Sequence, residues 1–273
     1  MGSTKVEIVV LGCGGSGGTP LAGGYWGAAD PNEPKNRRTR PSIAIQAQGK
    51  TLLIDTSPEV RLQTIAQNID SVDAIIYTHD HADHTNGFDD VRYLSIKKRI
   101  DGNSDYVMPI FATEKTMNLL RERFPYMFRT SDDGLYIPLI NPQIIHDDGV
   151  LDVFDGLQIP YVSQIHGQGS SLGFKIGSIG YSTDVSDYDS EMLEKLHGIE
   201  TWIVDCGQYG QADEDLTVHP NLRRVMEWNE TVQAKKLYLT HLTPRHDYQT
   251  INAETPDYIE CAYDGLRLKT VIE

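Results

Sequence analysis

Four potential metal ligands, three histidines and Asp83, stand within six residues in the segment Thr78-His79-Asp80-His81-Ala82-Asp83-His84, which constrains the fold more than any other stretch. The segment follows residues 73–77, an apolar and β-branched run that predicts a buried strand. Imidazoles and carboxylates delivered together at a strand end predict a metal site, because these ligands suit zinc, manganese, iron or nickel. A single histidine usually lies on the surface, or in a core with its hydrogen bonds made. Three histidines and an aspartate together would be costly to bury unless something pairs with them.

The spacing of these ligands predicts two metal ions. His79 and His81 would point to the same side of the strand, because side chains alternate along it. Asp83 and His84 follow where the chain must turn, so each pair could hold its own ion. Three ligands per ion would leave positions open for water and substrate.

The composition favours a globular protein that does not bind large nucleic acids. A net charge of -15 opposes binding to a phosphate backbone. No apolar run approaches the roughly 18 residues that a membrane span needs, and the first residues lack the apolar segment of a secretory signal. Cys13, Cys206 and Cys261 are odd in number and widely separated, which indicates reduced thiols. We therefore expect a cytoplasmic protein with no membrane partner.

Apolar and alternating runs predict two groups of strands, each interleaved with helices. Strands are expected at residues 6–11, 42–48, 51–55, 73–77, 108–112, 138–145, 150–154, 157–162, 171–176, 180–182, 201–205, 236–240, 258–260 and 266–270. Helices are expected at residues 58–68, 90–98, 113–123, 189–196 and 221–230. The strands between residues 137 and 181 are assigned to a second sheet, and the last two strands to a closing hairpin. This order predicts an α/β fold in which two sheets pack together with helices outside.

A glycine-rich loop at residues 12–20 follows the first predicted strand. It has no Walker lysine and no helical pattern after it, so it does not predict a nucleotide P-loop. We expect its backbone to pack closely near the metal site. The basic cluster Lys35, Arg37, Arg38 and Arg40 lies in the long polar segment that follows. Such a cluster is typical of a solvated face, and an anion site is the alternative.

Three further candidate ligands follow other predicted strands. His166 comes after residues 157–162 in a Gly/Ser-rich loop, Asp184 comes after Gly180-Tyr181-Ser182-Thr183, and His241 comes after residues 236–240. A single aspartate after a strand is usually a turn residue or a helix cap. The repetition of one pattern, a strand followed by a ligand, indicates that these side chains converge on one centre.

The run His79-x-His81-x-Asp83-His84, with His166, Asp184 and His241, resembles the five-motif signature of the metallo-β-lactamase superfamily. Asp55 in Leu53-Ile54-Asp55-Thr56 matches its first motif. The resemblance implies a four-layer αββα sandwich, with a single metallo-hydrolase domain over residues 1–273 and a dinuclear site between the sheets. It also implies that Asp55 orients the ligand loop from behind. The implied ligands are His79, His81 and His166 on one metal ion, Asp83, His84 and His241 on the other, and Asp184 bridging both.

Within that superfamily the chain most resembles the phosphoribosyl 1,2-cyclic phosphate phosphodiesterases of phosphonate metabolism. The resemblance lies in the glycine-rich opening, Arg38-x-Arg40-Pro41-Ser42, Val204-Asp205-Cys206, and the position of His219 between the Asp184 and His241 motifs. It implies that His219 assists at the scissile phosphate. On spacing alone, His219 could equally be a neighbour of the N-cap of the helix after Pro220.

These observations predict a metal-dependent phosphodiesterase that acts on a small cyclic or nucleotide-like phosphodiester. Two divalent ions, zinc or manganese with iron or nickel as alternatives, would hold a hydroxide that attacks phosphorus. His219 would protonate the leaving alkoxide or hold the phosphate, and Asp83 could also handle a proton. The expected partner is a small anionic phosphate ester or nucleotide, and a homodimer stays open.

Three other functions are consistent with the same motifs. They are an RNase Z-like tRNA endonuclease, a thioester hydrolase, and a metal-bound nucleotide-binding protein without turnover. The acidic balance weighs against tRNA, and the extra histidine suits a phosphate ester better than a thioester. We expect His146, His197 and His246 at the surface or behind the ligands, with His246 and Arg245 as rim contacts for an anion.

Overall fold

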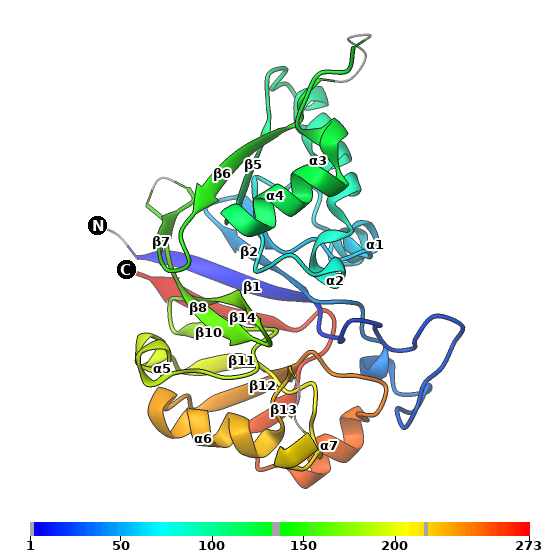
Figure 1. Cartoon of the computed structure of the whole chain (residues 1–273), viewed down its shortest axis with the longest axis vertical. Coiled ribbons are helices and arrows are strands. Elements are labelled where there is room, and N and C mark those ends of the chain that lie inside the picture. Colours follow the sequence, from blue (N-terminus) through cyan, green and yellow to red (C-terminus); the bar gives the residue numbers. More distant parts are fainter. Residues whose placement is uncertain (1–2, 133–136, 155, 216–217) are drawn as a thin grey trace.

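The computed structural model describes residues 3–132, 137–154, 156–215 and 218–273. Within these residues the strands form two seven-stranded sheets that pack face to face, and helices cover the outer face of each sheet (Figure 1). The predicted αββα sandwich is therefore confirmed.

The first sheet has the strand order β14-β1-β2-β3-β4-β5-β6. Strands β3, β4, β5 and β6 run parallel to one another. The pairs β14-β1, β1-β2 and β2-β3 are antiparallel. The carboxyl ends of β3 and β4 consequently lie at the same edge. The strands are Thr4–Gly12 (β1), Ser42–Ala47 (β2), Lys50–Ile54 (β3), Ala74–Ile76 (β4), Met108–Thr113 (β5), Ile140–Ile145 (β6) and Arg267–Ile272 (β14).

The second sheet has the order β13-β12-β11-β10-β9-β8-β7. Strands β10 to β13 are parallel, and β7 to β10 are antiparallel. The parallel half again brings several carboxyl ends to one edge. The strands are Gly149–Asp152 (β7), Gln158–His166 (β8), Gly169–Ile176 (β9), Ile179–Ser182 (β10), Thr201–Asp205 (β11), Lys236–Thr240 (β12) and Ile259–Cys261 (β13).

The main hydrophobic core lies between the two sheets. In β1, Val6, Ile8 and Val10 belong to this core, whereas Val9 and Leu11 belong to the layer beneath the helices. This alternation follows from the two-residue period of a strand, and it explains why β1 reads as a continuous apolar run. Both faces of the sheet are buried here.

Helices α1, α3 and α4 pack on the first sheet, and α5, α6 and α7 pack on the second. Thr113 caps the N-terminus of α4, because its side chain accepts a hydrogen bond from the backbone nitrogen of Thr116. None of the described helices is both long and apolar enough to cross a membrane. The helices are Val60–Ala66 (α1), Ala82–Thr85 (α2), Phe88–Ile100 (α3), Glu114–Arg123 (α4), Ser190–Leu196 (α5), Leu222–Val232 (α6) and Tyr248–Glu254 (α7). Three 3-10 turns lie at Pro34–Asn36, Pro125–Met127 and Asp213–Asp215.

Two predicted strand pairings are wrong. The strand predicted at residues 138–145 and assigned to the second sheet is β6, which pairs in parallel with β5 of the first sheet. The predicted closing hairpin does not form, because β13 pairs with β12 and β14 pairs with β1 of the other sheet. An apolar pattern indicates which face of a strand is buried, but it does not name the neighbouring strand.

Candidate metal centre

The predicted ligands lie at the carboxyl ends of strands from both sheets. The segment with His79 and His84 follows β4 of the first sheet. From the second sheet, His166 ends β8, Asp184 follows β10, and His241 follows β12. The prediction that His166 lies in a loop is wrong, because β8 continues to that residue in pairing with β9.

All seven predicted ligands come together in two groups that share Asp184. The ligand atoms of each group lie within 4.8 Å of one another. The first group is His79, His81, His166 and Asp184, and the second is Asp83, His84, Asp184 and His241. Asp184 thus occupies the position between the two groups that the family resemblance implies for a bridging ligand.

The two carboxylate oxygens of Asp184 face different groups. Its Oδ2 lies 3.3 Å from Nε2 of His166 and 3.6 Å from Nε2 of His79. Its Oδ1 lies 3.1 Å from Nε2 of His84 and 3.1 Å from Nε2 of His241. One side chain could therefore contact two cations at once.

His79 and His81 reach the same group for a different reason from the one predicted. Strand β4 ends at Ile76, and His81 is already the N-cap of α2. Side-chain alternation along a strand therefore does not apply to these histidines. They come together because the chain turns sharply into α2, whose first turn carries Asp83 and whose last carries His84.

Three residues of the site adopt a backbone conformation that residues other than glycine rarely take. Asp55, Asp184 and His241 have φ values of +65°, +50° and +58°. Asp55 directly follows β3 and His241 directly follows β12, whereas Asp184 follows β10 after one intervening residue. Such left-handed residues carry strain, which the surrounding contacts must offset, and they cluster at functional sites.

Asp55 lies behind the ligands, as the resemblance implies. Its Oδ2 lies 2.6 Å from Nδ1 of His84 and accepts a hydrogen bond from the hydroxyl of Thr78, while Oδ1 accepts from the backbone nitrogen of Thr78. These contacts hold the His84 ring with Nε2 toward the cluster. A carboxylate behind an imidazole in this way is the usual support of a metal-binding histidine.

The donor atoms of the cluster fit divalent cations. Nε2 of His79, His84 and His241 and Oδ2 of Asp83 are buried, and apart from the close contacts among the candidate ligands themselves none has a hydrogen-bond partner within the described parts of the chain. Buried polar atoms are normally hydrogen-bonded, so buried donor atoms that converge in this way are typical of a cation-binding site. Imidazole nitrogens and carboxylate oxygens are donors that zinc and manganese accept.

The electrostatics of the cluster also favour a bound divalent cation. Burial acts to lower the pKa of His84, but the carboxylates of Asp184, Asp55 and Asp83 raise it well above its usual value. Burial lowers the pKa of His79 well below its usual value, which favours the neutral imidazole that binds metals. The carboxylates thus favour a protonated, positively charged His84. A divalent cation bound beside them would supply this positive charge in its place.

His219 lies over the cluster and is held by Asp205. Its ring stacks on that of His241 at a centroid distance of 4.4 Å, and its Nδ1 lies 2.7 Å from Oδ2 of Asp205. Asp205 is fully buried and also accepts hydrogen bonds from the backbone nitrogens of Val185 and Gly207. Burial acts to lower the pKa of His219, but Asp205 outweighs this effect and raises it to about 9.

Asp205 has no role among the residues selected from the sequence. It ends β11, so it follows the same pattern of an apolar strand and then a carboxylate that selects Asp184. The sequence therefore contains a pattern that could have selected Asp205. The pattern does not show that Asp205 contacts a histidine fourteen residues later in the chain.

The glycine-rich loop packs against the site as predicted. Gly14 forms a β-bridge with Leu242, and Gly15 donates a hydrogen bond to the carbonyl of Leu242. A Cβ atom on Gly15 would lie 3.3 Å from the carbonyl oxygen of His241 and 3.4 Å from its Nδ1. Only a small residue permits the loop to lie this close to the ligand.

The interpretation of the basic cluster as a solvated face holds for Arg37, which is exposed, and is wrong for the other three cations. Arg38 is buried, with Nη1 donating to the carbonyl of His246 and Nη2 to Oδ1 of Asn36. Arg40 pairs with Glu59, and Lys35 lies over the Tyr248 ring at 4.4 Å. Arg38, Arg40 and Lys35 thus attach the long loop to the rest of the fold.

The remaining histidines divide between surface and interior. His146 and His197 are exposed as expected. His246 is buried and accepts a hydrogen bond at Nδ1 from the backbone nitrogen of Thr243. Burial lowers the pKa of His246 to about 4.

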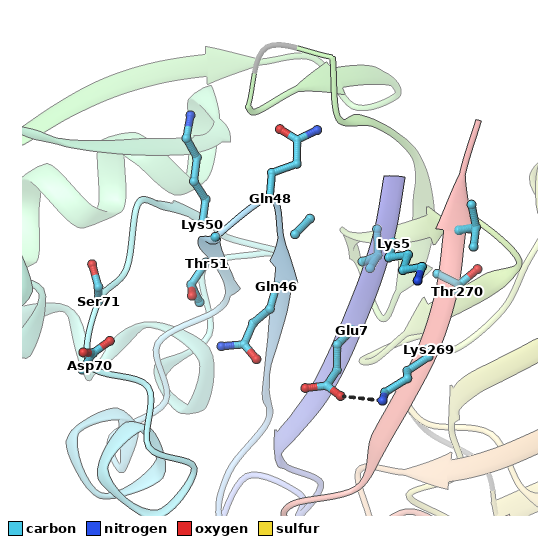
Figure 2. A pocket seen from close by; sticks show the side chains of 14 residues that line it. Lys5, Glu7, Gln46, Gln48, Lys50, Thr51, Asp70, Ser71, Lys269 and Thr270 are labelled. Carbon is cyan, nitrogen blue, oxygen red and sulfur yellow. Dashed lines mark ion pairs between the residues drawn. The ribbon is translucent and has the colours of Figure 1, made fainter. Parts of the chain in front are cut away.

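A cavity of about 510 Å³ opens beside the cluster, with His219 and His241 in its wall. The glycine-rich loop, Tyr25 and the segment from Thr243 to His246 form the other walls. A larger hollow of about 780 Å³ lies elsewhere, over β1, β2 and β14, and Figure 2 shows its side chains, including the ion pair of Glu7 with Lys269. That hollow has no histidine in its described lining, so the smaller cavity is the candidate substrate site.

A family model described as a beta-lactamase superfamily domain matches residues 50–242. The match begins in β3 and ends after His241, so it contains the seven candidate ligands.

Two solved structures resemble the chain over nearly its whole length. A crystal structure of a new diphosphatase from the PhnP family has a TM-score of 0.87 and 31% sequence identity, and the alignment covers 99% of each chain. The short form of human tRNase Z has a TM-score of 0.68 and 14% identity, over 96% of this chain and 98% of that one. At that identity the second likeness shows a shared fold alone.

A curated relative carries a different name. An octanoyltransferase of Porphyromonas gingivalis is 29% identical over 269 residues, which are 96% of this chain and 51% of that protein. The chain therefore spans about half the length of this relative, and the transferase name belongs to a protein with further residues.

Proposed function

The chain belongs to the beta-lactamase superfamily, and from this membership we propose that it is a metal-dependent hydrolase of small phosphodiesters and diphosphates. The observation that carries the proposal is the pair of ligand groups that share Asp184 and lie beneath His219. We propose that these groups hold two divalent ions, zinc or manganese, within one domain to which both sheets contribute. The proposed ligands are His79, His81, Asp83, His84, His166, Asp184 and His241.

Divalent ions bound there would lower the pKa of water and neutralise the oxygens of a phosphoryl group. The residues of the chain prepare the site for this chemistry. Asp55 orients His84, and the strained backbone at Asp184 and His241 directs both side chains into the cluster. Positions fixed in advance in this way do not have to be ordered during the reaction.

Hydrolysis adds a water oxygen to phosphorus and breaks the bond from phosphorus to the leaving oxygen, which then takes up a proton. We assign the delivery of that proton to His219. Its Nδ1 is bound to Asp205, so Nε2 is the ring nitrogen available to a substrate in the adjoining cavity. Asp205 fixes the orientation of the ring and favours its protonated form.

The likeness to the PhnP-family diphosphatase supports a phosphate substrate, because it extends over the whole chain at 31% identity. The fold shared with tRNase Z keeps the endonuclease alternative open, but the net charge of -15 opposes a polynucleotide substrate. Thioester hydrolysis would leave the His219 and Asp205 pair without a role that we can name.

Hydrolysis of bis-p-nitrophenyl phosphate, assayed with added zinc or manganese, tests this function. We expect metal-dependent turnover that the His84→Ala variant loses by at least about 100-fold. The exposed residue His197 gives a matched control, and His197→Ala should retain full activity. Binding of a nucleotide without any turnover would favour the non-catalytic alternative, and faster cleavage of a precursor tRNA than of any small ester would favour the endonuclease.

A further inference from the structure

The described lining of the cavity beside the metal centre contains no acidic side chain, although the chain is strongly acidic. The protein has 39 Asp and Glu residues against 24 Lys and Arg residues. None of the described residues that line the cavity is an Asp or a Glu, whereas Arg245 and three histidines are among them. A cavity with this lining in a chain of net charge -15 is suited to an anion.

Arg245 is an exposed cation on the wall of this cavity. It is exposed, and its guanidinium makes no ion pair or hydrogen bond with another residue in the described ranges. It lies four residues after His241, so the same segment carries a candidate metal ligand and this cation. A guanidinium binds phosphate through two parallel hydrogen bonds, which makes it suitable for a second phosphate next to the one at the metal centre.

Tyr25 brings an aromatic ring to the same cavity. It is 64% exposed and lies on the loop between β1 and β2, which projects from the edge of the molecule in Figure 1. An aromatic ring exposed on the wall of a cavity is accessible to a ligand bound there. Stacking against a flat heterocycle is a common use of such a ring.

Main-chain and buried polar contacts hold the loops of Tyr25 and Arg245 together. The backbone nitrogens of Ala28 and Ala29 both donate to the carbonyl oxygen of Pro244, at 2.9 Å and 3.1 Å. Asn36 donates to Asp247 at 2.6 Å, and the buried Arg38 donates to the carbonyl of His246 at 2.7 Å. The two recognition side chains are thus presented on a pre-organised wall, which reduces the entropy lost on binding.

We propose that this cavity is a specificity site for nucleoside diphosphate groups, in which Tyr25 stacks on the base and Arg245 binds the phosphate that is not cleaved. The proposal rests on the proposed function, since it places the scissile phosphate at the ligand groups. A volume of about 510 Å³ is within the range of cavities that enclose ligands of this size. The favoured substrate is therefore a diphosphate with a nucleoside on one side, in preference to a simple sugar phosphate.

Binding of ADP, AMP and ribose 5-phosphate to the metal-loaded protein, measured by calorimetry, tests the proposal. We expect ADP to bind at least about 10-fold more tightly than AMP, because only ADP can reach Arg245 with its second phosphate. Arg245→Gln should remove this difference, and Arg245→Lys should retain part of it. Tyr25→Ala should weaken ADP and AMP alike by about 10-fold and leave ribose 5-phosphate unchanged, while Tyr25→Phe should bind as the parent does.

Two exposed residues on other elements serve as controls. Arg61→Gln and Tyr93→Ala change the same residue types at α1 and α3 and should leave all three affinities unchanged. Equal affinity of the parent for ADP and AMP, or a difference that survives in Arg245→Gln, would overturn the proposal. Arg245-dependent binding without hydrolysis of any phosphodiester would support this site while contradicting the proposed function.

Discussion

At the scale of single residues, the pair His219 and Asp205 has the clearest consequences. Asp205 does not face the cavity, and its link to the reaction is the 2.7 Å contact with Nδ1 of His219. It is therefore a positioning residue, and its effect on proton delivery should depend on His219.

We predict that Asp205→Asn lowers kcat about 10- to 100-fold and that His219→Ala lowers it about 100-fold or more. The double variant should be no slower than His219→Ala, because residues that act through one another are not additive. Steady-state kinetics with bis-p-nitrophenyl phosphate would measure this. Metal content should stay at the parent level in all three, and Asp257→Asn, at an exposed aspartate, is the control. Fully multiplicative losses would contradict the link.

Asp264 predicts a pH dependence of stability away from the metal centre. It is half-buried and accepts hydrogen bonds from the backbone nitrogens of Cys13, in the glycine-rich loop, and Thr39, and from the Thr39 hydroxyl. Burial nevertheless raises the pKa of Asp264 from 3.8 to about 6. The folded state therefore holds this proton more tightly than the unfolded state does, and stability is lost as the pH rises from about 4 through about 6.

We predict that this residue contributes about 1 kcal/mol more to the free energy of unfolding at pH 5 than at pH 7. Urea unfolding of the parent and of Asp264→Asn at both pH values would isolate the contribution, because the asparagine does not titrate. The parent should lose stability relative to the variant as the pH rises. A difference between the two proteins that is the same at both pH values would show that Asp264 does not titrate in this range.

At the scale of elements, the ligand segment depends on how closely α2 approaches the loop after β3. Thr56 donates to the carbonyl of His84, and Gly87, between α2 and α3, donates to the carbonyl of Thr56. A Cβ atom on Gly87 would lie 2.1 Å from the carbonyl oxygen of Ser57. The φ angle of Gly87 is -81°, so an alanine would fit the backbone conformation and only the steric contact would matter.

We therefore predict that Gly87→Ala lowers the free energy of unfolding by about 1–3 kcal/mol and weakens metal binding, because α2 must move away. Denaturant unfolding and competition with a chelator would measure the two effects. Gly169→Ala is the matched control, since the nearest atoms to its Cβ would be 3.6 Å and 3.7 Å away. Unchanged metal affinity in Gly87→Ala would mean that the position of α2 does not control the site.

At the scale of the whole molecule, the ligand groups join the two sheets. His79 to His84 come from the first sheet, and His166, Asp184 and His241 come from the second. Bound ions would therefore link the two halves of the sandwich, and they would also relieve the repulsion between Asp83 and Asp184.

We predict that removal of metal by a chelator lowers the melting temperature by about 10 °C. An ion present at a thousand times its Kd stabilises the folded state by about 4 kcal/mol, and each kcal/mol corresponds to about 2–4 °C in a chain of this size. Differential scanning calorimetry with and without added zinc or manganese would measure the shift. His84→Ala should show a much smaller shift in melting temperature. A parent protein with the same melting temperature in the presence and absence of both metals would contradict a structural role for the ions.

Much of the site could be predicted from the sequence because its signals are local. Strands at residues 201–205 and 236–240 were expected within the bounds that β11 and β12 have, and both are short apolar runs. The pattern of an apolar strand followed by His or Asp selected all seven residues of the two ligand groups. A short stretch of sequence is enough to show which side chains can bind a metal and which segments must be buried.

The tertiary structure alone decided which distant segments meet. It placed β6 and β14 in the first sheet, set Asp205 against His219, and brought Tyr25 to the same cavity as Arg245. These choices depend on many weak contacts between segments far apart in the chain, and no single stretch of sequence carries their sum. The residues therefore determined the kind of chemistry, and the path of the chain determined which partner each residue has.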